Sequence, residues 1–452
     1  MTTPICDFVA AYKKQNAVRL HMPGHKGKKH LGAEGYDITE IDGADVLYSA
    51  HGIIKQSEDN AATLFDSGKT LYSTEGSSLC IRAILLLIKK YAESRGERPL
   101  ILAGRNAHKT FLSAAALLRI DVEWLFSKDN GLLSCRFDMA ECERLMVQKK
   151  VSALYVTSPD YLGNLTDIAA LSALCKKHGV LLTVDNAHGA YLKFLPTSLH
   201  PLDLGANLVC DSAHKTLSVL TGGAYLHVSK NAPAFFAEEA ERALAIFAST
   251  SPSYLILQSL DHANRLLEST LPKKLTALIS RVQTLKTRLA DRGYTLVGDE
   301  PLKLTLAPKC YGYMGLELAN LLAKKGIVCE FYDPDFVVLM ISADTKDRDL
   351  RALEKALSAI PRKAPIAEQM PRMTRPCAVM PLSDAMLAVG ERIPVEQAEG
   401  RILADVSVSC PPAVPILVSG EKISRDAIDC FAYYGMDTCL VVKKSLEKED
   451  KK

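Results

Sequence analysis

Short apolar runs alternate with amphipathic stretches through the middle of the chain. The segments 111–118 and 171–178 have the helical period, and Gly179 ends the second of them. Short strands that are apolar throughout and alternate with helices are typical of a parallel sheet covered on both faces. The pattern therefore predicts an α/β domain with a mainly parallel sheet. Its expected strands are residues 100–103, 151–157, 180–184, 206–210 and 224–228.

The pattern changes after residue 254 and predicts a second, smaller α+β unit. A long helical region, 254–292, is closed by Gly293. A proline-bearing stretch, 361–376, then resembles a linker into a last segment. The elements expected between them are strand 302–306, helix 316–325, strands 327–331 and 337–342, and helix 349–360. We expect an N-terminal segment (1–50), a large domain (51–270), a small α+β domain (271–365) and a C-terminal segment (366–452).

Composition narrows the class of protein. A chain of 452 residues with 48% hydrophobic content has enough apolar residues for more than one core. The net charge of +3 is small and the basic residues are scattered, which disfavours nucleic acid or an anionic membrane as a partner. The first residues lack a signal-peptide pattern, and no apolar run reaches about 18 residues. Twelve cysteines without a Cys-x-x-Cys pair indicate reduced thiols, so we expect a cytoplasmic protein.

Polar residues follow the ends of several predicted strands. His108, Asp185, His188 and the stretch 212–215 all stand just beyond an apolar run. Ligands of open α/β sheets bind outside the carboxyl ends of the strands, so these side chains are expected to converge on one pocket. Lys215 in such a place is difficult to desolvate as an ammonium, and burial there lowers its pKa and leaves a nucleophilic amine. We interpret Lys215 as the residue that carries pyridoxal 5'-phosphate (PLP) as a Schiff base.

The remaining requirements of PLP chemistry have candidates elsewhere in the chain. Asp185 can keep the pyridine nitrogen protonated, and His108 can cover the ring. The stretch 73–78 precedes the apolar helical run 79–88, and small residues at a helix start present backbone N–H groups to a phosphate. An ordinary N-cap explains that stretch equally simply. The expected phosphate site is Gly76, Ser77, Ser78 and Ser212.

Two other patterns are set aside. Ser67-Gly68-Lys69-Thr70 resembles the end of a P-loop, but Thr63 stands where the required earlier glycine would be. The N-terminal segment contains three histidines, and no carboxylate or spacing of a known zinc motif accompanies them. We predict no metal site, and we expect this segment to lie over the active site. The histidines are His21, His25 and His30.

Several sequence blocks are spread over nearly the whole chain. They are HMPGHKG (21–27), EGSS (75–78), GRNAHK (104–109), VDNAHGAY (184–191), SAHKTL (212–217) with TGGA (221–224), TSPSY (250–254) and CPPAVPILVSGE (410–421). Together these blocks resemble the bacterial ornithine/lysine/arginine decarboxylase family in its short form, PLP enzymes of the aspartate-aminotransferase fold (fold type I). The last block is one that ordinary fold type I aminotransferases lack.

The resemblance implies a role for each matching residue. Lys215 would bind PLP covalently, Asp185 would pair with the pyridine nitrogen, and His108 would stack on the ring. His188 would also contact the cofactor, and His214 beside Lys215 would serve in proton transfer to Cα. The family's site lies at a homodimer interface, which implies a contact between protomers, and the family has an acidic position near the substrate that Glu330 matches. Thr250 or Ser251 would reach the partner's phosphate, and Glu330 would bind the distal amine or guanidinium of the substrate.

The implied activity is PLP-dependent decarboxylation of lysine, arginine or ornithine to a diamine or agmatine, as in polyamine biosynthesis. Another fold type I reaction, transamination or a lyase reaction, stays open, as does an inactive PLP-fold regulatory protein. Two positions depart from the family pattern. Gly222-Gly223 follows Thr221 where many family members have a glutamine after the threonine or serine. Cys410 stands where the family has a tyrosine before the Pro-Pro pair. These departures leave the choice among the three substrates open.

Overall fold

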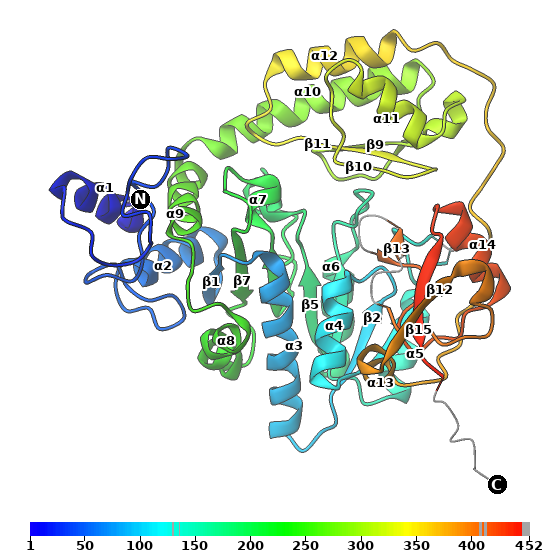
Figure 1. The fold of residues 1–452 in the computed structure, drawn as a ribbon, viewed down its shortest axis with the longest axis horizontal. Coiled ribbons are helices and arrows are strands. Elements are labelled where there is room, and N and C mark those ends of the chain that lie inside the picture. The colour runs from blue at the N-terminus through cyan, green and yellow to red at the C-terminus, as the bar shows by residue number, and fades with distance from the viewer. Residues whose placement is uncertain (129–130, 135, 406–408, 411–413, 445–452) are drawn as a thin grey trace.

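The computed structural model describes residues 1–128, 131–134, 136–405, 409–410 and 414–444, and a seven-stranded sheet forms its centre (Figure 1). The strand order is β1-β7-β6-β5-β4-β2-β3, and β7 alone runs antiparallel to its neighbours. The predicted α/β fold with a mainly parallel sheet is therefore confirmed. The strands are β1 Lys69–Ser73, β2 Leu100–Gly104, β3 Asp121–Leu125, β4 Ala153–Thr157, β5 Leu181–Asp185, β6 Leu208–Asp211 and β7 Ala224–Val228.

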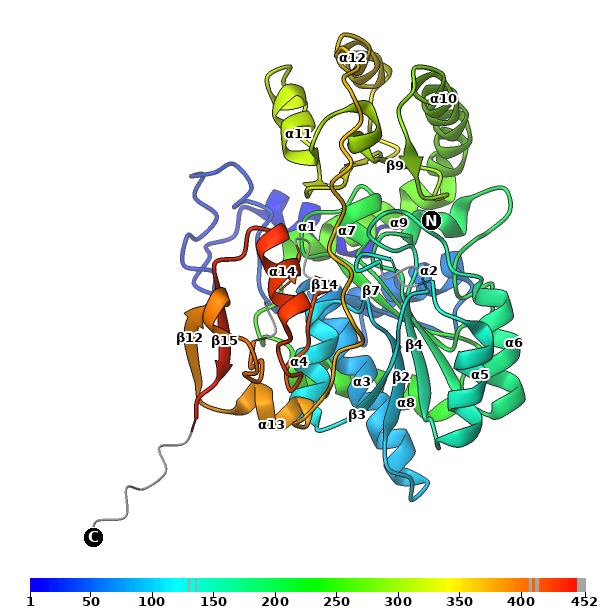
Figure 2. The same cartoon turned by 90° about the vertical axis from the view of Figure 1, so that its right-hand side faces the viewer.

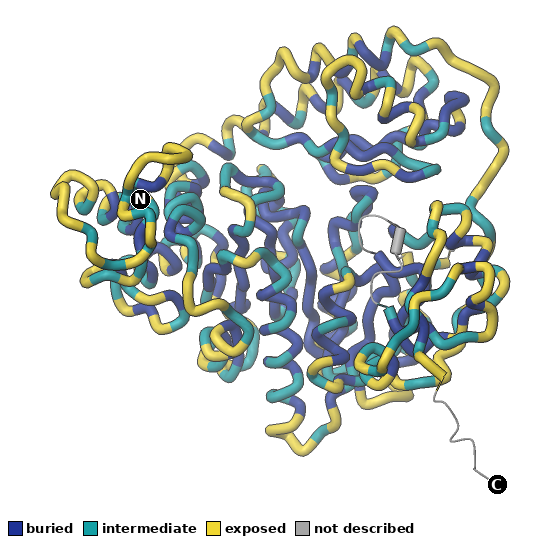
Figure 3. The backbone as a smooth tube through the Cα atoms, viewed as in Figure 1, coloured by how far each residue is buried: buried dark blue, intermediate teal, exposed yellow. Residues whose placement is uncertain are grey.

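Helices cover both faces of this sheet, which explains why its inner strands are mainly apolar and buried (Figure 3). In β4, Ala153 and Tyr155 belong to one hydrophobic core, and Leu154 and Val156 to the other. The first core includes α3 Gly76–Ser94, α4 Lys109–Leu118 and α8 Ala234–Phe247. The second includes α1 Pro4–Gln15, α2 Ile53–Phe65, α5 Met139–Gln148, α6 Ile168–His178 and α9 Tyr254–Ser269.

A four-stranded antiparallel sheet with three helices lies above the carboxyl edge of the large sheet (Figure 2). The region 254–292 is two helices rather than one, because α9 ends before Thr270 and Pro272 stands in the first turn of the next helix. The predicted strand 327–331 is wrong for most of its length: Val328 is exposed, and the strand begins only at Phe331. The elements are α10 Leu271–Asp291, β8 Leu296–Val297, β9 Lys303–Leu306, α11 Gly315–Ala323, β10 Phe331–Tyr332, β11 Val337–Met340 and α12 Asp347–Ser358.

The C-terminal segment forms a small core of its own beside α4. Ile416, Ile423 and Phe431 are buried in it. Pro411 to Ala413 of the CPPAVPILVSGE block lie outside the described residues, as does the side chain of Cys410. The elements are α13 Leu382–Leu387, β12 Gly390–Pro394 paired with β15 Thr438–Val442, β13 Ser409–Cys410 paired with β14 Val414–Pro415, and α14 Arg425–Tyr433. Within the part of the chain that the structure describes, no helix is long and apolar enough to cross a membrane.

A buried ion pair joins this segment to the large sheet. Arg105 follows β2, and its Nη2 lies 2.9 Å from Glu421 Oε2. We expect Arg105→Met to destabilise the protein by about 3 kcal/mol, because Glu421 would remain buried without its cation. Arg98→Met is the control, since Arg98 is 83% exposed in its pair with Asp121 and should contribute under about 1 kcal/mol. Equal losses in denaturant unfolding for the two variants would contradict this expectation.

Candidate active site

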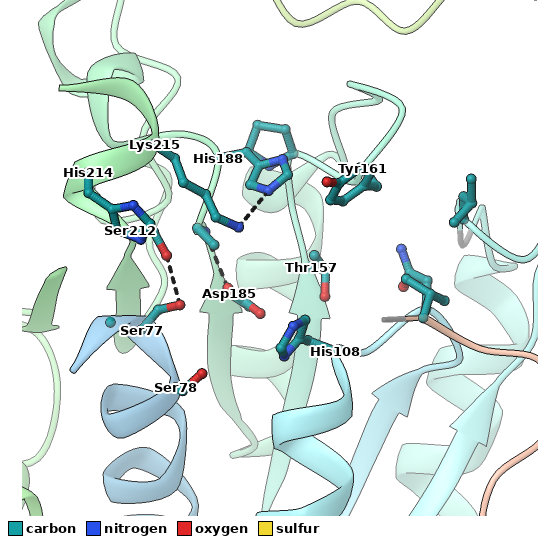
Figure 4. Close-up of a pocket in the computed structure, with 16 residues that line it drawn as sticks. Ser77, Ser78, His108, Thr157, Tyr161, Asp185, His188, Ser212, His214 and Lys215 are labelled. Atoms are coloured by element: carbon teal, nitrogen blue, oxygen red, sulfur yellow. Dashed lines mark hydrogen bonds between the residues drawn. The ribbon is translucent and has the colours of Figure 1, made fainter. Parts of the chain in front are cut away.

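A cavity of about 260 Å³ opens at the carboxyl edge of the large sheet (Figure 4). Its walls come from the ends of β4, β5 and β6, from the first turn of α3 and from the residues just before α4. The convergence expected from strand-end positions is therefore observed. The predicted residues that line this cavity are Gly76, Ser77, Ser78, His108, Asp185, His188, Ser212, His214 and Lys215.

Lys215 lies in α7 Ala213–Thr216, a short helix that follows β6. Its Nζ is 2.9 Å from His188 Nε2 and points into the cavity (Figure 4). Burial lowers the pKa of the Lys215 amine, and the negative charge of Asp185 offsets part of that effect. The local environment therefore favours a larger fraction of neutral, nucleophilic amine than an exposed lysine has.

Asp185 is the last residue of β5 and is 2% exposed. The Tyr155 hydroxyl donates to its Oδ2 at 3.1 Å, and the Ala187 backbone N–H donates to its Oδ1 at 3.2 Å. With the Cys210 thiol, which lies 3.6 Å from Oδ1, these donors orient the carboxylate so that it faces the same cavity as Lys215 (Figure 4). A buried carboxylate in this position is suited to hold a cationic group of a ligand.

His108 is the N-cap residue of α4. The Thr110 backbone N–H donates to His108 Nδ1 at 3.2 Å, which fixes the ring against the start of the helix. Burial lowers the pKa of His108, so the ring is neutral at pH 7. Figure 4 shows this ring facing Asp185, where it forms one wall of the cavity.

The first turn of α3 forms another wall. Its N–H groups have no acceptor within the helix, and the Ser212 hydroxyl donates to Ser77 Oγ at 2.8 Å beside them. This arrangement is suited to an anion. The Gly76 N–H donates to Gly222 O at 2.7 Å, and Gly222 has a φ of +100°. A Cβ on Gly222 would lie 2.8 Å from Thr74 O, so the first departure from the family pattern has a steric reason.

One buried polar atom of the described cavity lining lacks a hydrogen-bond partner. Thr157 Oγ1 is buried and unpartnered among the described residues, and Thr157 lies opposite Asp185 in the β4–β5 register. Thr157 lines the cavity, and an unsatisfied hydroxyl there favours a bound ligand with a polar edge. Together with the amine, the carboxylate, the flat ring and the helix N-terminus, it makes this cavity fit PLP.

Three predicted site residues do not line the cavity. Thr250 and Ser251 are exposed in the segment between α8 and α9. The neighbouring Ser249 N–H donates to Glu75 at 2.8 Å, just before α3 begins. Glu330 is exposed, and its Oε1 accepts a hydrogen bond of 3.3 Å from Tyr161, a residue of the cavity wall. The roles expected for these three residues stay predictions.

Sequence reasoning missed Tyr161 and Lys303. The Tyr161 ring packs edge-on to His188, with 5.0 Å between ring centres. Lys303 comes from β9 in the upper sheet, and its Nζ lies 2.7 Å from His188 Nδ1. The sequence feature that could have indicated Lys303 is a lysine between Leu302 and Leu304 in an otherwise apolar strand.

A second histidine group lies beneath the cavity. His200 Nε2 and His227 Nε2 lie 3.0 and 3.2 Å from one oxygen of Asp211, and all three side chains are fully buried. The Asn186 amide donates to the other Asp211 oxygen at 2.7 Å. Although this geometry has the residue types of a metal site, hydrogen bonds already satisfy both Asp211 oxygens. We interpret it as a network that supports the end of β6.

Comparisons with known proteins agree with this geometry. The domain family described as "Orn/Lys/Arg decarboxylase, major domain" matches residues 3–297, and its C-terminal domain matches residues 369–438. An arginine decarboxylase of Halalkalibacterium halodurans is 28% identical, over 94% of this chain and 91% of its own. An arginine decarboxylase of Bacillus subtilis is 26% identical, over 98% of this chain and 95% of its own.

Solved structures show the same fold. The crystal structure of a Francisella novicida lysine decarboxylase superposes with a TM-score of 0.79 at 16% identity, covering 98% of this chain and 81% of that chain. A serine palmitoyltransferase of Sphingomonas wittichii has a TM-score of 0.56 at 14% identity, over 78% of this chain and 82% of that chain. Because the major-domain match alone spans more than half of the sequence, the chain belongs to the Orn/Lys/Arg decarboxylase family and is a PLP-dependent amino-acid decarboxylase of fold type I.

Proposed function

We propose that the enzyme removes CO2 from a basic amino acid in the cavity around Lys215. The observation that carries this proposal is the meeting of Lys215, Asp185 and His108, each from a different strand end, in one cavity. Bound PLP supplies an electron sink for the electron pair left on Cα when CO2 leaves. The protein's part is to hold the cofactor, orient the substrate and move protons.

Each wall of the cavity has a part in holding PLP under this proposal. The Lys215 amine would bind the aldehyde carbon, and Asp185 would hold a proton on the pyridine nitrogen. The His108 ring would pack against the cofactor ring. The first turn of α3, with Ser77, Ser78 and Ser212, would donate hydrogen bonds to the phosphate.

The reaction also needs one proton at Cα after CO2 has left. His214 and Lys215 are adjacent in α7 and both line the cavity, so either can deliver that proton. Burial lowers the pKa of His214, so its ring is mainly neutral at pH 7 and would have to gain a proton before it delivers one to Cα.

Arginine is the first substrate to test, because several curated relatives that match over most of the chain are named arginine decarboxylases. Glu330 is the proposed acceptor for the distal guanidinium, beside Tyr161 at the cavity wall. Lysine and ornithine stay candidates, because one carboxylate serves an ammonium as well. We further propose a cytoplasmic homodimer that shares its active sites through Thr250 or Ser251.

A decarboxylation assay with added PLP tests the proposal. We expect CO2 and the matching amine from arginine, at a higher kcat/KM than from lysine or ornithine. A keto acid without CO2 would instead indicate transamination. Bound PLP without turnover of any of the three amino acids would indicate an inactive regulatory protein.

Ser212→Ala tests the phosphate site. Loss of one hydroxyl donor to an anion should weaken PLP binding about tenfold, because hydrogen bonds to charged groups contribute roughly 1.5–3 kcal/mol. Ser94→Ala is the matched control, since Ser94 is exposed at the opposite end of α3. Equilibrium titration of the PLP-free protein gives both dissociation constants. Equal values for the two variants would argue against Ser212 as a phosphate contact.

A further inference from the structure

The imidazole of His188 lies between two lysine amines. Lys215 Nζ is 2.9 Å from Nε2, and Lys303 Nζ is 2.7 Å from Nδ1. Lys303 is 3% exposed and reaches the site from β9 of the upper sheet, whereas Lys215 comes from the end of the large sheet. The imidazole therefore connects an amine from each sheet. Figure 4 shows its contact with Lys215.

Proton counting restricts the charges of this group. A neutral imidazole has one N–H donor and one acceptor nitrogen, and an ammonium can only donate. Two ammonium groups cannot both donate to one neutral imidazole that has a single acceptor. Burial, followed by the positive charge of Lys303, lowers the pKa of His188 well below its usual range, so the ring is neutral. One of the two lysines must then be a neutral amine that accepts from the ring.

Burial lowers the pKa of both lysines, but the hydrogen-bond partners of Lys303 favour the charge on that residue. Its Nζ donates to the Asp160 backbone oxygen at 3.1 Å and lies 5.7 Å from the centre of the Tyr161 ring. For Lys215 Nζ, His188 is the hydrogen-bond partner present among the described residues. The balance of contacts therefore gives an ammonium at Lys303, a proton on His188 Nε2 and a neutral amine at Lys215.

We propose that Lys303 is a positioning residue that acts through His188 to keep the Lys215 amine neutral and ready to capture PLP. This inference rests on the proposed function, in which Lys215 is the residue that binds the cofactor. In the capture step, Lys215 Nζ uses its lone pair to attack the aldehyde carbon. A C=N bond forms, the C=O bond breaks, and the oxygen leaves as water with the two amine protons.

The effect has a defined pH range. Burial lowers the pKa of Lys303 to about 8, so its charge is present below that pH and is lost above it. The assistance to Lys215 is therefore expected near pH 7 and disappears in alkaline solution, where Lys215 loses its proton unaided. The charged and titratable groups that face the two lysines and His188 are Asp185, Glu330, Cys210, His108, His214, Glu300 and Asp160.

The test follows the rate of PLP capture by the PLP-free full-length protein, measured by visible absorbance across a pH series. Lys303→Met should slow capture at pH 7 about tenfold, the change expected if the pKa of Lys215 rises by about one unit. Lys303→Gln should slow capture to the same extent, because glutamine keeps a donor for the Asp160 backbone oxygen but lacks the charge. Lys286→Met is the matched control: Lys286 also has a pKa lowered by burial, but it donates to the Glu300 backbone oxygen.

A double variant separates action through His188 from a direct electrostatic effect. In a His188→Phe background, Lys303→Met should cause no further slowing. A tenfold loss that persists in that background would overturn the inference, as would wild-type capture rates for both Lys303 variants when circular dichroism shows them folded.

Lys215→Ala distinguishes a failure of this inference from a failure of the proposed function. If Lys215→Ala captures PLP at the wild-type rate, the proposed function itself fails. If Lys215→Ala abolishes capture while the folded Lys303 variants match the wild type, the role of Lys303 alone is wrong.

Discussion

Replacing Lys215 with alanine is expected to lower kcat for decarboxylation by about a thousandfold or more. The amine that binds PLP would be lost, and with it one of the two groups able to return a proton to Cα. Because the side chain ends in a cavity and its one described partner is His188, the fold should tolerate the change. Steady-state CO2 release with saturating arginine and PLP measures the effect.

The control for that substitution is Lys230→Ala. Lys230 is an exposed lysine that pairs with Asp66 on the surface, far from any wall of the cavity. It should leave kcat unchanged within about a factor of two. Retention of wild-type turnover by Lys215→Ala would show that Lys215 is not the cofactor lysine.

Asp185→Asn should lower kcat by about a hundredfold or more. The amide has the same shape but no charge to hold a proton on the pyridine nitrogen. Tyr155 and the Ala187 N–H donate to different oxygens of the carboxylate, so the single amide oxygen can accept from one of them. Removing a preorganised electrostatic contact from a buried site has effects of this order. Single-turnover kinetics with bound PLP separate a slower chemical step from weaker cofactor binding.

Tyr155→Phe is the graded control for the same carboxylate. It removes the 3.1 Å hydrogen bond to Asp185 Oδ2 but leaves the charge in place. We expect a loss of about tenfold or less, corresponding to one hydrogen bond. If Tyr155→Phe reduces kcat as much as Asp185→Asn, orientation of the carboxylate rather than its charge would be the important property.

The sequence predicted those strands of the large sheet that are buried on both faces. Continuous apolar runs mark β2, β4, β5, β6 and β7, because each residue of such a strand contacts one of two cores. The runs do not mark the two edge strands. In β3 most side chains are only partly buried, and β1 begins with the Lys69-Thr70 pair that also resembles a P-loop.

The break between α9 and α10 shows another limit of sequence patterns. Both helices keep an apolar face with the same period, so residues 254–292 read as a single helix. Thr270 ends the first helix, and Pro272, which a first turn tolerates, does not reveal where the second begins.

The site could be predicted in part because its residues follow strand ends. Asp185, His108 and Lys215 each stand after an apolar run, and parallel strands bring such positions to one edge. Lys303 could not be placed this way. It contacts His188 across 115 positions of sequence, from a different sheet, and chain order gives no sign of that contact.

The cofactor lysine can be identified by reducing the PLP-loaded enzyme with borohydride and mapping its peptides by mass spectrometry. Lys215 lines the cavity, and the Lys303 amine lies 2.7 Å from His188 Nδ1 behind the cavity wall, so the experiment compares two neighbouring amines. We expect the added pyridoxyl mass on Lys215, with none on Lys303. A pyridoxyl group on Lys303, or on any other lysine while Lys215 stays unmodified, would contradict the proposed site.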